Sequence, residues 1–145
     1  MLKEEFTHFT LSILVGLVIG YFFHNYWSVV AVLITGFLID SDHLIDYFVF
    51  SKGRFNYSQF KSGSYFDDSG KVYVFFHGFE FAIILIILGI VVSNLSWLFF
   101  SLGFSNLIHL LFDTVANKPI WPTYFITFRI AKNFDHKSFD FKCQK

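Results

Sequence analysis

The 145-residue chain is 54% apolar, only 15% charged, and has a mean hydropathy of +0.55. These values lie outside the range of ordinary soluble domains, and 23 Phe, 7 Tyr and 3 Trp supply more aromatic surface than so small a core can bury. The formal net charge of zero gives no broad field that would attract nucleic acid. Composition therefore predicts one membrane-embedded domain over residues 1–145, in which the lone Cys143 can form no internal disulfide.

Four apolar segments are each long enough to cross a bilayer as a helix. They span residues 6–23, 27–50, 72–92 and 95–116. The first is not expected to be a cleaved signal peptide, because it ends in bulky aromatic residues. The second and third segments are joined by a long loop, 51–71, which is rich in Ser, Gly and charged residues. The tail from 117 to 145 is predicted to be an interfacial extension.

The basic residues are distributed to one side. All eleven Lys and Arg lie in the N-terminal segment, the long loop or the tail, and none lies in the two tight turns. In an up-down-up-down bundle these three regions share one face, and basic residues keep such a face in the cytoplasm. The sequence thus predicts an all-α, four-helix bundle in the inner or plasma membrane, with both termini cytoplasmic.

Ionisable residues interrupt the apolar segments at the ends that this topology brings together. They are His8 in the first segment, Asp40, Asp42, His43 and Asp46 in the second, His77 and Glu80 in the third, and His109 and Asp113 in the fourth. Spacings of three or four residues put the members of a pair on one side of a helix. Because unpaired ionisable groups at membrane depth are costly, their convergence predicts a metal site.

Imidazole and carboxylate ligands without a thiolate suit Zn²⁺, with Mn²⁺ and Fe²⁺ as alternatives, and one or two ions are expected. The predicted ligands are His8, Asp40, Asp42, His43, His77, Glu80, His109 and Asp113. Each has a plainer interpretation: His8 as a headgroup-facing side chain, the Asp40 to His43 block as a solvated helix end, and His109 with Asp113 as a private ion pair. Asp46 is expected to support a ligand from behind.

The same residues form a recognisable set of motifs. These are an early histidine (His8), a D-x-D-H block ending at His43, a histidine before the third helix (His77), and H-x-x-x-D at His109 and Asp113, followed by Trp121-Pro122. In these motifs the sequence resembles the membrane-bound predicted metal-dependent hydrolases whose bacterial members are described as LexA-regulated inner-membrane proteins. The resemblance extends over nearly the whole chain. That family often carries H-R-G-x-T-H-S before the third helix, whereas this chain keeps only the last histidine, with Glu80 nearby.

The resemblance implies hydrolysis, in which a divalent ion lowers the pKa of its water toward ~7 and a carboxylate takes the proton. Glu80 and Asp42 are the expected catalytic carboxylates, and Asp40 or Asp42 would bridge a second ion. A site at headgroup level favours an amphiphilic, lipid-like ester or phosphoester among membrane lipids, and Arg54 and the loop lysines would attract phosphate.

Two other classes of function remain open. An ion or proton transporter would string its polar groups across the membrane, whereas the distal halves of these segments are apolar apart from small hydroxyls. A non-enzymatic membrane anchor or interaction protein would use the metal only to hold the helix ends together. A test of whether the protein folds without metal would distinguish this structural role from an enzymatic one.

Overall fold

The structure is a computed structural model that describes residues 2–52, 54–117 and 121–139; the side chains of residues 2–6, 8, 37, 38, 117, 121 and 139 lie outside this description. Within these residues the fold is helical and contains no strand beyond an isolated bridge between Lys71 and Asp135. The four long helices are α1 (Leu2–Phe23), α2 (Trp27–Ser51), α5 (Phe79–Val91) and α6 (Ser96–Asn117). The short ones are α3 (Tyr57–Ser62), α4 (Ser64–Ser69), α7 (Ile126–Ala131) and the 3₁₀ turns η1 (Ser93–Leu95), η2 (Trp121–Tyr124) and η3 (His136–Phe139).

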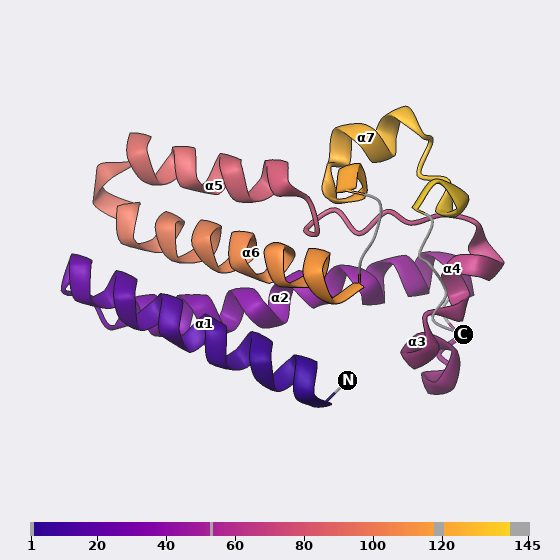
Figure 1. The fold of residues 1–145 in the computed structure, drawn as a ribbon, viewed down its shortest axis with the longest axis horizontal. Helices are drawn as coiled ribbons and strands as arrows, with labels where there is room; N and C mark the ends of the chain where they lie inside the picture. Colours follow the sequence, from indigo (N-terminus) through magenta and orange to yellow (C-terminus); the bar gives the residue numbers. More distant parts are fainter. Residues whose placement is uncertain (1, 53, 118–120, 140–145) are drawn as a thin grey trace.

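The four long helices run side by side, and α6 packs against α1, α2 and α5 (Figure 1). Glycines permit the close approach of neighbouring helices. A Cβ added at Gly103 of α6 would lie 2.8 Å from Ile86 Cγ1, and one at Gly16 of α1 would lie 2.8 Å from the Cα of Val29. Small residues at such contacts are typical of helices that associate in lipid, where close packing has to supply the attraction.

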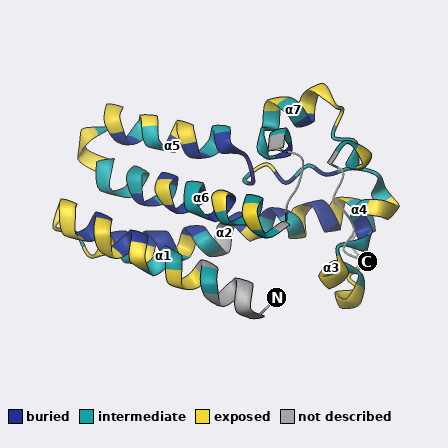
Figure 2. Cartoon of the chain, viewed as in Figure 1, coloured by how far each residue is buried: buried dark blue, intermediate teal, exposed yellow. Residues whose placement is uncertain are grey.

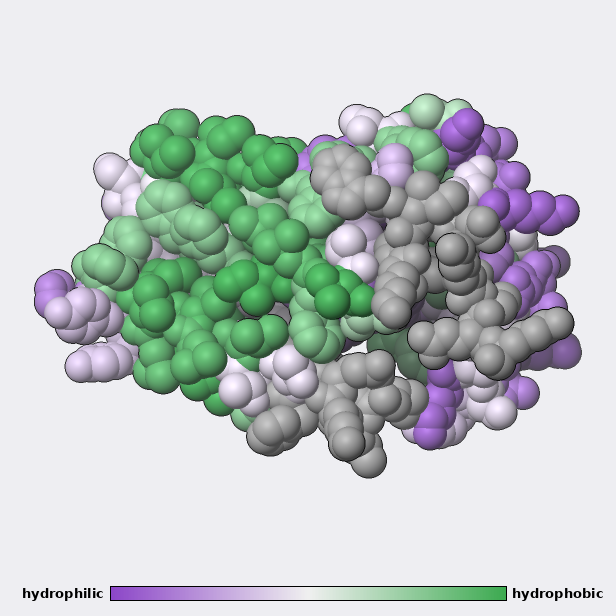
Figure 3. All heavy atoms as spheres, viewed as in Figure 1, coloured by the Kyte–Doolittle hydropathy of each residue, from purple (hydrophilic) through white to green (hydrophobic). Residues whose placement is uncertain are grey.

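Much of the bundle's exterior is apolar. Residues with side chains more than half exposed include Val18, Ile34, Ile90 and Val91, and Figure 2 shows exposed positions along α1 and α5. In Figure 3 apolar residues cover the part of the surface formed by these helices, whereas hydrophilic residues gather at the end that carries α3, α4 and α7. Trp27–Ser51 and Ser93–Ala116 are long and apolar enough to cross a membrane, while the apolar helices Phe9–Phe23 and Phe79–Val91 are shorter.

The predicted boundaries of the first, second and fourth helices lie within a few residues of α1, α2 and α6, but the third differs. The helix predicted over 72–92 begins only at Phe79, and the residues before it are not helical. We call residues 72–78 the crossing segment; it runs alongside the C-terminal half of α2 and leads from α4 to α5 (Figure 1). The 13 residues of α5 are about 20 Å long at about 1.5 Å per residue. The predicted loop 51–71 contains α3 and α4, and the tail contains α7.

Candidate metal centre

Three separate parts of the chain supply a cluster of imidazole and carboxylate side chains, which we call the centre. The C-terminal half of α2 carries Asp40 and His43, the last turns of α6 carry His109 and Asp113, and the crossing segment carries His77. Two sets of three have ligand atoms within 4.8 Å of one another: Asp40, His43 and His77, and His77, His109 and Asp113. These are the residue types and the closeness that a divalent ion requires.

The distances between the ligand atoms match the size of such an ion. His77 Nε2 lies 3.5 Å from Asp40 Oδ1 and 3.9 Å from Asp113 Oδ2. His109 Nε2 lies 3.5 Å from the same Asp40 oxygen and 3.3 Å from the same Asp113 oxygen. Ligands placed ~2.0–2.1 Å from a tetrahedral ion are about 3.4 Å apart. These imidazole and carboxylate atoms are therefore close to the spacing of neighbouring ligands around a small ion, and His77, His109 and Asp113 form one of the two grouped sets.

The group is buried on one side and open on the other. The side chains of His77 and His109 are 6% exposed and that of Asp113 is 13% exposed, whereas that of Asp40 is 60% exposed. Solvent can thus reach the group past Asp40, while the side chains of His77, His109 and Asp113 are shielded.

Asp42 orients His77 from behind. Its carboxylate accepts the hydrogen of His77 Nδ1, with Oδ1 at 3.0 Å and Oδ2 at 3.1 Å, and Oδ2 also accepts the N–H of Phe76 at 2.8 Å. Burial disfavours a charged His77, but the hydrogen bonds with Asp40 and Asp42 outweigh it and raise the pKa of His77 to about 9. An ion at Nε2, the atom that faces Asp40 and Asp113, would therefore have to displace a proton. The neutral ring would then offer its lone pair at Nε2 while Nδ1–H stays bonded to Asp42.

Tyr65 of α4 plays the corresponding part for His43. Its hydroxyl lies 3.3 Å from His43 Nδ1 and donates to the backbone carbonyl of His43 at 3.3 Å. Burial, followed by the charges of Asp46 and Asp42, raises the pKa of Tyr65, so the phenol keeps its proton. If the phenol donates to the carbonyl, Nδ1–H of His43 donates to the phenol oxygen and Nε2 is left to accept or to bind an ion.

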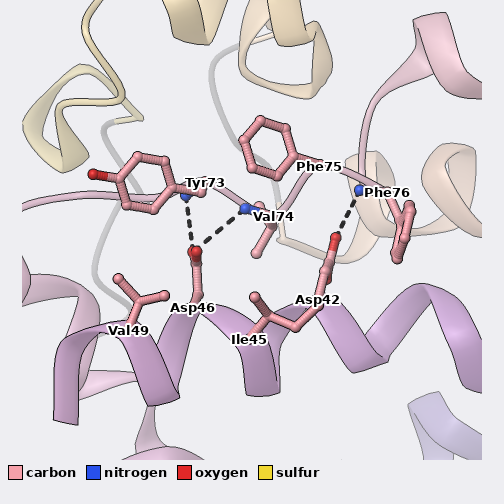
Figure 4. Close-up of a pocket in the computed structure, with 8 residues that line it drawn as sticks. All are labelled: Asp42, Ile45, Asp46, Val49, Tyr73, Val74, Phe75 and Phe76. Carbon is pink, nitrogen blue, oxygen red and sulfur yellow. Dashed lines mark hydrogen bonds between the residues drawn. The ribbon is translucent and has the colours of Figure 1, made fainter. Parts of the chain in front are cut away.

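The crossing segment is held to α2 by carboxylates. Asp46 Oδ2 accepts the N–H groups of Tyr73 at 2.8 Å and Val74 at 3.3 Å, beside the bond from Phe76 to Asp42 (Figure 4). Along this contact lies a groove of about 320 Å³, lined by Asp42, Ile45, Asp46, Val49, Tyr73, Val74, Phe75 and Phe76. Both carboxylates point to the backbone N–H groups, which leaves apolar side chains to form the walls of the groove (Figure 4).

The structure brings together five of the eight predicted ligands: Asp40, His43, His77, His109 and Asp113. Asp42 and Glu80 are not among the grouped ligand atoms. Glu80 Oε2 accepts the N–H of Ile126 at 2.9 Å, and Oε1 accepts the N–H and hydroxyl of Thr127 at 3.0 and 2.8 Å. The Glu80 carboxylate is therefore engaged at the start of α7. The side chain of His8 lies outside the described residues.

Glu80 lies away from the candidate ligands because the backbone between it and His77 is not helical. The predicted pairing of His77 with Glu80 assumed one continuous helix, but His77 belongs to the crossing segment and Glu80 to the first turn of α5. Gly78 between them is extended, with φ −121° and ψ 130°. The three-residue spacing consequently gives no common face.

Sequence reasoning missed Arg129, Asn106 and Tyr65 as supports of the centre. Arg129 is 1% exposed and donates to backbone carbonyls of the crossing segment, and Asn106 Nδ2 donates to the carbonyl of Phe76 at 3.1 Å. Asn106 lies three residues before His109, a helical spacing that could have identified it. Arg129 offers a weaker signal, a single cation within the apolar stretch from Phe125 to Ile130.

Comparison with known proteins adds no relative: no protein-family model, no curated protein and no solved structure matches the chain. The residues and geometry of the centre itself are therefore the basis for inferring a function.

Proposed function

We propose that the chain is a four-span membrane protein whose polar end holds a divalent metal ion and hydrolyses an ester or phosphoester bond of an amphiphilic, lipid-like substrate. One observation carries the proposal: imidazole nitrogens and carboxylate oxygens from α2, α6 and the crossing segment lie 3.3–3.9 Å from one another in four pairs. Separate segments brought to such spacing are difficult to explain by packing, because buried carboxylates and imidazoles are costly without a shared partner.

Three of these residues are the best candidates for ligands. His77, His109 and Asp113 form the more buried set, and two histidines with one carboxylate resemble the protein ligands of hydrolytic zinc sites. Mn²⁺ and Fe²⁺ suit the same donors and stay as alternatives. A divalent ion bound there would lower the pKa of water toward ~7 and polarise an ester or phosphoryl oxygen.

Asp40 is the best candidate for the base. Its Oδ1 lies 3.5 Å from both candidate ligand nitrogens, and its side chain is the most exposed of the group. In this position the carboxylate can accept a proton from an attacking water as the ester or phosphoester bond breaks. Asp42 and Glu80 are less suited, because backbone and side-chain donors already occupy their oxygens.

The membrane part of the proposal is supported by the exterior of the bundle. The two helices long enough to cross a bilayer are only 38% and 33% buried in their most apolar windows, unlike the core helices of a soluble protein. We include α1 and α5 as the other spans, although about 20 Å of α5 is shorter than a hydrocarbon core of ~30 Å. The distribution of basic residues would place the protein in the cell membrane with its polar end and both termini facing the cytoplasm. The resemblance to membrane-bound predicted metal-dependent hydrolases agrees with this proposal.

Metal content is the first test. Protein purified in detergent without chelators should contain close to one equivalent of transition metal, and His77→Ala and His109→Ala should contain far less. His24→Asn is the matched control, because His24 lies in the turn between α1 and α2 and its left-handed φ of 49° suits asparagine. Wild-type protein that remains without metal after exposure to Zn²⁺, Mn²⁺ and Fe²⁺ would refute the proposal.

Topology is tested separately by labelling. In a Cys143→Ser background, single cysteines at Ser62 of α3 and Asn94 of η1 should react with an impermeant reagent from opposite sides of the membrane. Reaction of both from the outside would refute the four-span arrangement.

A structural role for the ion is the competing proposal, and one observation favours it: the candidate ligands join three segments of the fold. An ion that only ties these segments together should be needed for folding and should support no turnover. Metal-loaded protein that hydrolyses none of a broad set of lipid esters and phosphoesters, and that unfolds on metal removal, would favour this role.

A further inference from the structure

We propose that Arg129, on the short tail helix α7, is a positioning residue of the metal centre, and that the C-terminal tail thereby sets the geometry of His77. This inference rests on the proposed metal centre. It extends that proposal to a residue that lies 52 positions from His77 in the sequence and that touches none of the candidate ligand atoms.

The contacts of Arg129 are directed at the backbone of the crossing segment. Its Nη1 donates to the carbonyls of Tyr73 at 2.8 Å and Val74 at 2.7 Å, and its Nη2 donates to the carbonyl of His77 at 2.5 Å. The residue is 1% exposed, and its Nε has no hydrogen-bond partner among the described residues. One guanidinium thus fixes both ends of a five-residue stretch, which a single ammonium group could not do.

On the other side of the same stretch, carboxylates of α2 accept backbone N–H groups. Asp46 accepts the N–H groups of Tyr73 and Val74, and Asp42 accepts the N–H of Phe76. The peptide group between Tyr73 and Val74 therefore lies between the carboxylate of Asp46 and the guanidinium of Arg129. Hydrogen bonds on both sides of one peptide group polarise and strengthen one another.

Val74 shows that this arrangement overrides local preference. Its φ of 25° is unfavourable for a β-branched residue, while its N–H is bonded to Asp46 and its carbonyl to Arg129. A conformation of this kind persists where surrounding contacts impose it. Removing the guanidinium would leave the carbonyls of Tyr73 and His77 without their donor and that of Val74 with only the N–H of His77. The segment could then relax and move the ring of His77 with it.

Helix α7 is itself fixed close to the centre, so Arg129 is presented from a defined place. Glu80 accepts the N–H groups of Ile126 and Thr127 at the start of α7, which ties this helix to the first turn of α5. Gly78 permits the approach, because a Cβ at that position would overlap the side chain of Ile126. The tail is thus attached on both sides of His77.

The test uses Co²⁺ as a spectroscopic probe of the full chain in detergent. Arg129→Met keeps a long side chain without donors, and we expect it to weaken Co²⁺ binding by roughly 10- to 100-fold and to change the ligand-field absorption. Lys132→Met is the matched control, because Lys132 is an exposed cation three residues further along the chain, and it should bind Co²⁺ as the wild type does.

Arg129→Lys covers the case in which the methionine variant does not fold. Because the lysine retains the charge, the variant should unfold near the wild-type temperature. Because it cannot reach all three carbonyls, its Co²⁺ spectrum and affinity should still change. Wild-type affinity and spectrum in both Arg129 variants would overturn the positioning role and leave the metal centre standing. Failure of the wild type to bind Co²⁺ would instead remove the centre and the inference together.

Discussion

Asp42 of α2 is hydrogen-bonded to His77 of the crossing segment: Asp42 Oδ1 lies 3.0 Å from His77 Nδ1, while its other oxygen accepts the N–H of Phe76. A helix residue thereby fixes the ring of a candidate ligand 35 positions away and the backbone of the residue before it. Asp42 is 3% exposed, so each of these bonds is shielded from water. This relationship makes the carboxylate more important for metal affinity than for proton transfer.

Asp42→Asn should reduce affinity for Zn²⁺ by about 10- to 100-fold, because an amide cannot accept from both donors without turning its own N–H₂ toward one of them. Destabilisation by about 1–3 kcal/mol is expected as well, since a buried donor loses its partner. Competition with a chromophoric chelator measures the affinity. Asp68→Asn, which alters an exposed carboxylate bonded to Gln59, should leave the affinity unchanged.

Asp40→Asn should abolish hydrolysis while leaving most of the metal bound, because the proposed base is lost and the ligands His77, His109 and Asp113 are retained. Asp113→Ala should lose metal and turnover together. Metal content and turnover measured on the same preparations distinguish the two cases. If Asp40→Asn also loses its metal, Asp40 is a ligand and the base lies elsewhere.

Glu80→Gln should keep its metal and its turnover within a few-fold of the wild type, in contrast to the role expected from sequence. The lost charge weakens the hydrogen bonds to Ile126 and Thr127, which should cost about 1–3 kcal/mol of local stability. Hydrogen exchange should accordingly become faster in α7 and remain unchanged in α1. Complete loss of turnover with full metal content would restore Glu80 as the base.

Gly103→Ala should destabilise the bundle by about 1–3 kcal/mol, because its Cβ would lie 2.8 Å from Ile86 and 3.2 Å from the carbonyl oxygen of Ala82. Gly36→Ala is the matched control, since its nearest neighbour would be Ser12 Oγ at an ordinary 3.5 Å. Thermal unfolding in detergent compares the two. Equal stability of both variants would show that α5 and α6 can separate at little cost.

The positions of the long helices could be predicted from hydropathy alone, because α1, α2 and α6 are apolar over nearly their whole length. The start of α5 could not. The run from Val72 to Phe76 is as apolar as the helix that follows, and a short apolar run of this kind does not distinguish helix from extended chain. The contacts with Asp42, Asp46 and Arg129 hold these residues in a non-helical form that includes a turn at Phe75 and Phe76, and these three residues are distant in sequence.

Most of the centre was predictable for a related reason. His43, His109 and Asp113 lie on helices whose ends were placed correctly, so their convergence followed from topology. His77 also joins the group, although by a different backbone path from the one expected. The assignment of Glu80 depended on helical periodicity across Gly78, and the role of Arg129 depended on where the tail docks, which periodicity does not report.

The proton on His77 Nδ1 has a consequence for stoichiometry. Both candidate sets of three ligands include His77, yet with Nδ1–H donated to Asp42 this side chain has a single lone pair to offer. Two ions could not share it, so the sets Asp40–His43–His77 and His77–His109–Asp113 would be alternative binding positions for one ion. The first includes the exposed Asp40 and the second is more deeply buried, so an arriving ion would meet the first set before the second, with His77 common to both.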